Sequence, residues 1–178
     1  LLVYLKDINF DAAGNPILLY ITSHDFQPGP SGSPRTWTIA HWNNNVWSFY
    51  DVAPAFHNYD MGSLYIQQDG SWKIIAPFDA GPQKWGTGGE MSMWISTDEG
   101  QNWGKEKDLT SNSQRNHGYA RRPVNAHPDF YAFWADGNPD TMSVSRLYFT
   151  NQAGNVFQLP YHMHEQYATP EPVRNQVE

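Results

Sequence analysis

The sequence predicts an all-β protein built from repeated four-stranded antiparallel sheets. Gly, Pro, Asn and Asp punctuate the chain about every eight to twelve residues, and short runs with strand-like alternation lie between them. Amphipathic windows long enough for a helix are missing from the sequence. With 178 residues, the chain is long enough to bury one sizeable core.

Internal repetition gives the size of the repeated unit. Three turn signals each lead into a strand-like run, and Leu18, Lys73 and Tyr131 hold the same position in those runs, which gives a period of about 55–58 residues. The three runs are Ile17–Ile21 after Gly14-Asn15-Pro16, Trp72–Ala76 after Asp69-Gly70, and Phe130–Trp134 after Pro128-Asp129.

A second marker is the stretch Ser96–Trp103, which reads S-x-D-x-G-x-x-W. Ser and Asp bond to the backbone of their own turn, and Gly supplies a positive φ at no steric cost. Trp103 then anchors the hairpin turn on the sheet, and its counterparts one period away are Trp47 and Phe157. The two markers together predict a β-propeller with three blades, at about residues 1–52, 53–110 and 111–160.

Three blades do not close a ring, because propellers have about four to eight. We therefore expect residues 1–160 to be part of a six- or seven-bladed ring, with the missing blades supplied by the rest of a longer chain or by a second copy. The sequence begins at Leu1 without Met or a signal peptide, as in a fragment or a processed chain. Residues 161–178 are polar and contain Pro, which predicts a C-terminal tail, a linker or an edge piece.

Composition excludes several classes of partner. The formal net charge of −7 and the pI near 5.4 argue against nucleic acid and against an anionic membrane surface. No apolar run approaches the length of about 20 residues that a membrane span needs. Cysteine is absent, so the chain has neither disulfides nor thiolate metal sites. Aromatic residues make up 15% of the chain, enough for ordinary packing and for a sugar-binding face.

The repeat also predicts which residues share one end of the propeller. Loops leading into the inner strands, at 6–7, 56–60 and 115–123, lie at the same end as the loops between the second and third strands, at 24–35, 79–90 and 136–145. Loops on a rigid scaffold are where binding and catalytic residues concentrate. The catalytic candidates are His57, Tyr59, His117 and Tyr119, and the substrate-binding candidates are Asp60, Trp85, Glu90, Arg121, Arg122 and Asp136.

The motif His-x-Tyr recurs at the same place in two blades. His57 and Tyr59 precede one inner strand, and His117 and Tyr119 hold the corresponding place one period later. A repeat that preserved structure alone would keep apolar and turn residues there, so the recurrence favours a ligand site near the channel mouth. If Arg121 or Arg122 faces the channel, that site favours an anionic ligand.

Each candidate also has an ordinary structural interpretation. Asp60 could cap a turn, the two histidines could be satisfied loop residues, and Arg121 or Arg122 could form a structural ion pair. The glycines at 86, 88 and 89 are turn glycines, because no helix or Lys-Ser/Thr follows them as a phosphate loop requires. His162 and His164 share one face of an extended segment, but a third ligand is unidentified. No cofactor is predicted, and a structural calcium or other metal ion stays an open alternative.

The stretch Ser96–Trp103, its weaker copy Thr150–Phe157 and the blade pattern resemble the BNR, or Asp-box, repeat families. The phrases His57–Tyr65 and Arg121–Phe130 are similar to uncharacterised bacterial BNR-repeat proteins. The resemblance covers nearly the whole chain. It implies a secreted, periplasmic or cell-surface carbohydrate-active propeller. In these families the box lies in a peripheral turn, away from the active face.

Two characterised groups are similar in blade pattern. Sialidases carry an Arg-Ile-Pro motif before their boxes, whereas Arg121-Arg122-Pro123 matches only as R-x-P and lies after the box, which disfavours sialidase activity. Seven-bladed polysaccharide lyases that cut uronic-acid glycans such as ulvan use His, Tyr and Arg on the channel face. Against their pattern, His57 and Tyr119 match, but their second His falls at Pro77–Asp79 and their Arg near Trp134–Asp136, where this chain has other residues.

The sequence thus leads to two hypotheses. In the first, the propeller degrades an acidic or plant- or algal-type polysaccharide, by elimination through the His, Tyr and Arg candidates or by hydrolysis through a carboxylate pair drawn from Asp60, Glu90 and Asp136. In the second, it is a non-catalytic propeller that binds glycan or protein, with Tyr59, Trp85, Tyr119 and Trp134 stacking on sugar rings.

Overall fold

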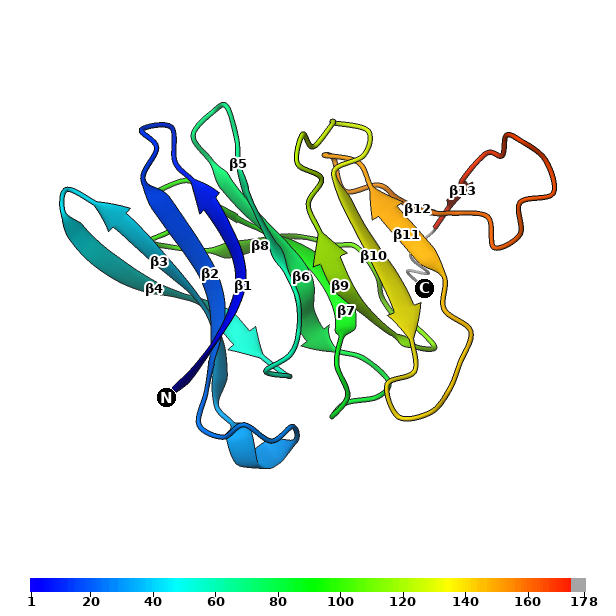
Figure 1. The fold of residues 1–178 in the computed structure, drawn as a ribbon, viewed down its shortest axis with the longest axis horizontal. Helices are drawn as coiled ribbons and strands as arrows, with labels where there is room; N and C mark the ends of the chain where they lie inside the picture. The colour runs from blue at the N-terminus through cyan, green and yellow to red at the C-terminus, as the bar shows by residue number, and fades with distance from the viewer. Residues whose placement is uncertain (174–178) are drawn as a thin grey trace.

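The computed structural model of the chain, which describes residues 1–173, is built from antiparallel β-sheets (Figure 1). Its helical content within those residues is one 3₁₀ turn, η1 (Pro30–Gly32). The prediction of an all-β fold is therefore confirmed. The last five residues of the predicted tail lie outside the described residues.

The first sheet contains four strands in sequence order, each paired antiparallel to the next. They are β1 (Leu2–Phe10), β2 (Pro16–Ser23), β3 (Arg35–Asn43) and β4 (Val46–Ala55). Alternation on β2 explains the orientation of this sheet. Ile17, Leu19 and Ile21 are fully buried against the second sheet, whereas Leu18 between them is only half-buried.

The second and third groups of four strands follow the same up-and-down order. A single backbone pairing, Gly89 with His117, joins them into one continuous sheet, and a short C-terminal strand adds to the third group. The second group is β5 (Ser63–Ile66), β6 (Trp72–Ala80), β7 (Gly89–Ser96) and β8 (Gly104–Asp108). The third is β9 (Asn116–Arg121), β10 (Ala132–Gly137), β11 (Leu147–Thr150) and β12 (Val156–Gln158), with β13 (Glu171–Pro172) beside β12.

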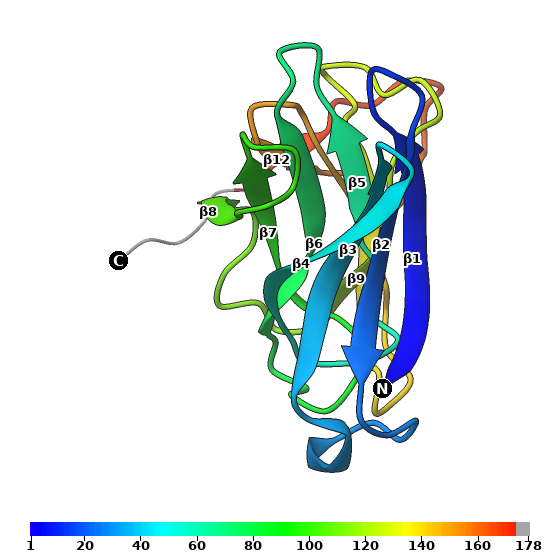
Figure 2. The same ribbon diagram turned by 90° about the vertical axis from the view of Figure 1, so that its left-hand side faces the viewer.

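The three groups lie side by side in a propeller-like arrangement (Figures 1 and 2). The middle group is covered on both faces, and β6 shows why. Trp72, Ile74 and Ala76 point into the core shared with the first group, whereas Ile75 points into the core shared with the third. Because side chains alternate along a strand, one continuous apolar run can fill two cores.

Side-chain hydrogen bonds join the first strands of the three groups. Leu64 of β5 donates its backbone N–H to Asp7 of β1 at 2.8 Å, and Asn9 of β1 donates to the Leu64 carbonyl at 2.9 Å. Ser63 of β5 donates to the carbonyl of Ala120 on β9 at 3.0 Å. The inner strands β1, β5 and β9 are therefore held next to one another.

The stretch Ser96–Trp103 forms the tight turn between β7 and β8. The Ser96 hydroxyl accepts the N–H of Gly100 at 2.9 Å, and Gly100 has φ +83°. Asp98 accepts the N–H of Asn102 at 2.9 Å, and the Trp103 indole donates to the Gly100 carbonyl at 2.9 Å. The side chains thus satisfy the turn backbone as the sequence predicts.

The three aromatic counterparts do not all occupy one kind of position. Trp103 packs on the core between the first and second groups. Trp47, which is opposite Trp42 in the register, lies on the outer face of the first sheet. Phe157 stacks on Phe149 on the face of the third group that points away from the second, and its neighbour Val156 points into the core instead. The repeat period predicts the position of each aromatic residue only to within about one residue. On a strand, a shift of one residue places the side chain on the opposite face of the sheet.

Candidate functional site

The connections between strands lie at two opposite ends of the molecule. What we call the loop end carries the connections β2–β3, β4–β5, β6–β7 and β10–β11, at the bottom of Figure 1. The turn end, at the top, carries the tight turns and the β9–β10 connection. The sequence expected an inner-strand loop at 115–123, but β9 occupies Asn116–Arg121, so His117 and Tyr119 lie on the strand itself.

At the loop end, residues 57–60 fold into a compact turn just before β5. Asp60 donates its backbone N–H to the His57 carbonyl, and the His57 N–H returns a bond to Asp60 Oδ2, both at 3.2 Å. Tyr59 donates its N–H to His57 Nδ1 at 3.0 Å. His57 is 4% exposed and Tyr59 is 52% exposed, so the turn holds the imidazole inside and presents the phenol outside.

Asp60 connects this turn to the β6–β7 loop. Its Oδ1 accepts the N–H of Gly88 at 2.6 Å, and the carboxyl lies in a site where the residue is 1% exposed. Burial raises the pKa of Asp60 to about 8, against the opposing effect of the two backbone N–H donors and of the Lys6 and Arg35 charges. Each carboxyl oxygen of Asp60 therefore accepts one backbone N–H, Oδ2 from His57 and Oδ1 from Gly88.

The first group contributes the other side of the site. Lys6 donates its ammonium to the Asn58 carbonyl at 2.7 Å, and the Tyr4 ring meets the Tyr59 ring edge-on, with centroids 5.5 Å apart. The Lys6 ammonium also lies 5.5 Å from the centroid of the Tyr4 ring. Arg35, buried behind the turn, donates to the Phe56 carbonyl at 3.3 Å. Side chains from β1 and β3 of the first group and from the turn 57–60 of the second group thus lie together. We call Lys6, His57 and Tyr59, with the residues around them, the His57 constellation.

The electrostatics fix the protonation of this constellation near neutral pH. Burial, together with the charges of Arg35 and Lys6, lowers the pKa of His57 to about 4, so its ring is neutral. Because Nδ1 accepts the Tyr59 N–H, the proton of the neutral ring sits on Nε2, for which residues 1–173 supply no hydrogen-bond partner. Burial lowers the pKa of Lys6 to about 8, which leaves it largely charged at neutral pH.

His117 lies in a different environment from His57. Its Nδ1 accepts the indole N–H of Trp134 at 3.0 Å, and its ring packs edge-on against Tyr148, with centroids 4.8 Å apart. It is 6% exposed, in the space between the second and third groups. Burial lowers the pKa of His117, so it too is neutral near pH 7. Within residues 1–173, no hydrogen bond or ring contact joins His117 to His57 or Tyr59, so the convergence of the two His-x-Tyr pairs on one face stays a prediction.

Tyr119 sits on a β-bulge of β9. The register with β10 shifts between Phe133 and Ala135, and Tyr119 has φ +63°. A bulge re-aims the side chains around it, and here the phenol is 57% exposed beside a cavity of about 380 Å³ against the β10–β11 connection. Within residues 1–173, no hydrogen bond or ring contact joins Tyr119 to His57 or Tyr59.

The two neighbouring arginines diverge. Arg121 is exposed and donates to the carbonyl of its own neighbour Ala120. Arg122 lies at the turn end, where it donates to the Ile8 carbonyl at 3.4 Å and lies 3.6 Å from Asp7. Arg122 thus contacts β1 at Asp7 and Ile8, whereas the turn that holds His57 contacts β1 at Tyr4 and Lys6.

The remaining substrate-binding candidates have local partners. Glu90 accepts from the Thr110 hydroxyl at 2.5 Å and from the Ser113 backbone at 2.7 Å. Asp136 forms an ion pair with Arg115 at 3.0 Å and accepts from the Tyr148 hydroxyl at 3.2 Å. Trp85 is 46% exposed on the β6–β7 loop, beneath the Lys84 ammonium.

Within the described part of the chain, no group of three or more His, Cys, Asp or Glu side chains is placed to hold a metal ion. The rings of His162 and His164 lie 5.8 Å apart without a third such residue. No helix among the described residues is long and apolar enough to cross a membrane.

The comparisons with known proteins bear on the fold. No protein-family model and no curated protein matches this chain. It is similar to two solved structures of an ulvan lyase from a new polysaccharide lyase family, PL25, one of them bound to -[GlcA(1-4)Rha3S]-. Each has a TM-score of 0.66 and 17% identity, over 84% of this chain and 32% of the lyase. The chain therefore has the propeller-like fold of that lyase and spans about a third of its length.

Sequence reasoning missed the first-group side of the site. The sequence pattern places Lys6 in a loop leading to an inner strand and gives no link from His57 to Lys6 or to Tyr4. The signal that could have found them is the repeat itself, since β1 is the inner strand of the first group and must neighbour β5.

Proposed function

We propose that this chain carries part of a carbohydrate-active site that binds an acidic polysaccharide and cleaves it by β-elimination. The observation that carries the proposal is the constellation of Lys6, His57 and Tyr59, which places a cation, a free imidazole N–H and an exposed phenol beside one another. The fold shared with a polysaccharide lyase supports the carbohydrate class of ligand.

The residues supply the parts that elimination at a uronate requires. Lys6 neutralises the uronate carboxylate and the Nε2–H of His57 donates a hydrogen bond to it, which together make the C5 proton more acidic. Tyr59, as the general base, takes that proton, the C4–O4 bond breaks, and a C4=C5 double bond forms. Tyr59 then returns the proton to the O4 leaving group, so the side chain ends as it began.

Hydrolysis is the less well supported chemistry. It calls for two carboxyl groups flanking the scissile bond. Asp60 is 1% exposed with a backbone donor on each oxygen, and Glu90 and Asp136 are held by side chains elsewhere. Elimination needs none of these three groups as a catalyst.

A non-catalytic glycan-binding role is the second candidate. It is favoured by the exposed rings of Tyr59, Trp85 and Tyr119, which offer flat apolar surface to sugars. We further propose that the chain belongs with the Asp-box propellers, acts in a secreted, periplasmic or cell-surface setting, and is completed to a ring by further blades.

The test is to incubate the full chain with a glucuronate-containing polysaccharide and, in parallel, with a neutral glucan. Elimination predicts a rise in ultraviolet absorbance from the unsaturated uronate with the acidic polymer alone. New reducing ends without that absorbance indicate hydrolysis. Saturable binding of the acidic polymer with neither product supports the binding role, and absence of binding contradicts both.

A further inference from the structure

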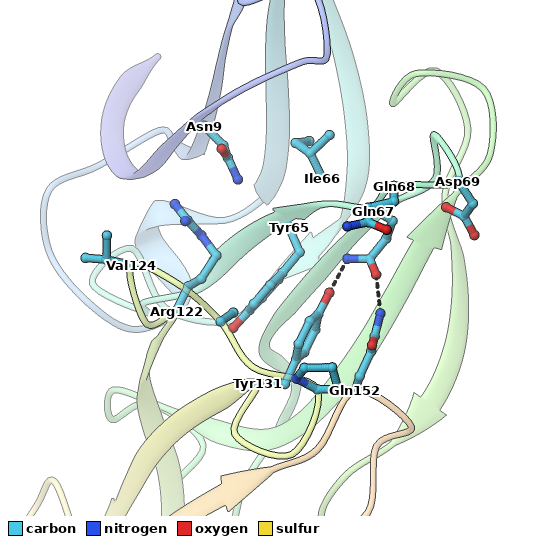
Figure 3. A pocket seen from close by; sticks show the side chains of 12 residues that line it. Asn9, Tyr65, Ile66, Gln67, Gln68, Asp69, Arg122, Val124, Tyr131 and Gln152 are labelled. Atoms are coloured by element: carbon cyan, nitrogen blue, oxygen red, sulfur yellow. Dashed lines mark hydrogen bonds between the residues drawn. The ribbon is translucent and has the colours of Figure 1, made fainter.

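A second cavity lies at the turn end, away from the His57 constellation. Its volume is about 570 Å³, and we call it the turn-end cavity. Asn9, Tyr65, Gln67, Arg122, Tyr131 and Gln152 line it, from the ends of β1 and β5 and from the β9–β10 and β11–β12 connections (Figure 3). Residues from all three groups thus meet there, in a size range typical of small-molecule sites.

One wall of the turn-end cavity is a chain of amide and phenol groups. Gln67 donates to the Tyr131 hydroxyl, and Gln152 donates to the Gln67 carbonyl oxygen at 2.6 Å (Figure 3, dashed lines). These bonds leave N–H groups of both amides free, since each amide nitrogen has two. These hydrogen bonds hold the three side chains in place, and the N–H groups that stay free suit the hydroxyls of a ligand.

Two buried polar atoms in the cavity wall have no hydrogen-bond partner among residues 1–173. Tyr65 is 2% exposed and stacks on Tyr131 with centroids 4.2 Å apart, yet its hydroxyl makes no hydrogen bond. The Nε–H of Arg122 is also buried and unpaired. Leaving such groups unsatisfied is unfavourable, most of all when the group is charged, so a ligand that satisfies them gains affinity.

We propose that the turn-end cavity binds an anionic sugar unit of a glycan. The Arg122 guanidinium is the cation in its lining. Its Nη2 donates to the Ile8 carbonyl and lies 3.6 Å from Asp7, whereas its unpaired Nε–H, with the Tyr65 hydroxyl, would engage a carboxylate or sulfate oxygen. Gln67, Gln152 and Asn9 would bond the ring hydroxyls. The lining carboxylate of Asp69 is already engaged, because its Oδ1 accepts from the backbone and hydroxyl of Ser71 at 2.9 and 2.7 Å.

This second site does not rest on the proposed elimination. It lies at the opposite end of the inner strands from His57 and shares no residue with that constellation. A polymer held there would be anchored away from the reacting unit, as in enzymes that use remote binding energy.

The test is a titration of the full chain followed by NMR of the side-chain N–H signals of Gln67, Gln152 and Arg122. The probes are sodium glucuronate, glucose as its neutral match, and sodium acetate as a charge without a sugar. We expect glucuronate to shift these signals saturably, and glucose to bind about tenfold more weakly, the effect of losing one charge-assisted hydrogen bond. Acetate should shift them without reaching saturation over the same range.

Three variants sharpen the result. Arg122→Gln should weaken glucuronate binding at least about tenfold. Tyr65→Phe should weaken it severalfold without lowering the melting temperature, because the described part of the chain offers the removed hydroxyl no partner in hydrogen-bond geometry. Arg121→Gln, the matched control, removes the same charge from an exposed neighbouring position and should bind like the unaltered chain.

The proposal is overturned if glucuronate leaves the three signals unmoved, if acetate saturates them equally, or if Arg121→Gln weakens binding as much as Arg122→Gln. Shifts confined to His57 and Tyr59 would overturn it while supporting the proposed function. If glucuronate binds at Arg122 but the chain forms no unsaturated uronate, the turn-end site is supported and only the proposed elimination is contradicted.

Discussion

Gly88 donates its backbone N–H to the carboxyl of Asp60 at 2.6 Å, at a point where three chain segments meet. The acceptor belongs to the turn that holds His57, and the donor belongs to the β6–β7 loop. A Cβ atom on Gly88 would lie 2.5 Å from the carbonyl oxygen of His117 on β9. Because Gly88 has no side chain, the turn that holds His57 and strand β9 of the third group can both lie close to its backbone.

Gly88→Ala should destabilise the chain by about 2 kcal/mol or more. The residue has φ +85°, which costs a side chain roughly 1–3 kcal/mol, and the new methyl group would meet backbone that cannot turn aside. Gly104→Ala is the control, because a Cβ there meets nothing within 4 Å. Chemical denaturation of both variants checks this. Equal stability of the two would contradict the close approach.

Asp60 should make the chain less stable as the pH rises above 6.5. Its folded-state pKa of about 8 lies above the ordinary 3.8, so its contribution is complete at low pH and is lost as pH rises through 8. His57 and His117, whose pKa values are lowered from 6.5, act below that window. From pH 6.5 to 8 the unfolding free energy should fall by roughly 1–2 kcal/mol relative to Asp60→Asn. Parallel pH profiles for the two proteins would refute the assignment.

Tyr59→Phe should lower the rate of unsaturated uronate formation about a hundredfold or more, the usual effect of removing a general acid or base. Its hydroxyl has no partner among residues 1–173, so the melting temperature should stay unchanged. Tyr161→Phe removes a phenol of similar exposure, 54%, from outside the site and should keep full activity. Loss of activity in both variants, or in neither, would remove Tyr59 from the mechanism.

Affinity for an acidic saccharide at the loop end should fall as the pH passes 8. The pKa of Lys6 is lowered to about 8, so its positive charge is present below that pH and disappears above it. Lys6→Met should bind weakly at every pH and lose most of this dependence, and what remains comes from Asp60, which ionises over the same range. Lys84→Met, which changes an exposed lysine in the β6–β7 loop, should keep it. Isothermal titration between pH 6 and 9 measures the difference.

Trp103→Ala should cost roughly 2–3 kcal/mol, less than a fully buried aromatic, because Trp103 is half-buried on the first core. Its indole bond to the Gly100 carbonyl is lost as well. Trp47→Ala should cost less, since Trp47 is 38% exposed on an outer face. If thermal melting ranks the two the other way, the anchoring role belongs to another residue.

The all-β class and the blade repeat could be predicted because their causes are local. Turn residues such as Asp98 and Gly100 bond or bend within a few positions of themselves, and alternation along β2 and β6 marks buried faces directly. The apolar, glycine and aspartate pattern therefore determined where strands begin and end and how often the unit recurs.

Only the tertiary structure decided which candidates share a site. His57 and His117 hold the same place in the repeat, yet one closes a turn beside Lys6 and the other is enclosed against Trp134. A bulge at Tyr119 and the packing of the second group on the third set those directions. Side chains on a strand reverse with every residue, so a shift of one position changes the face, and the sequence period does not resolve a single position.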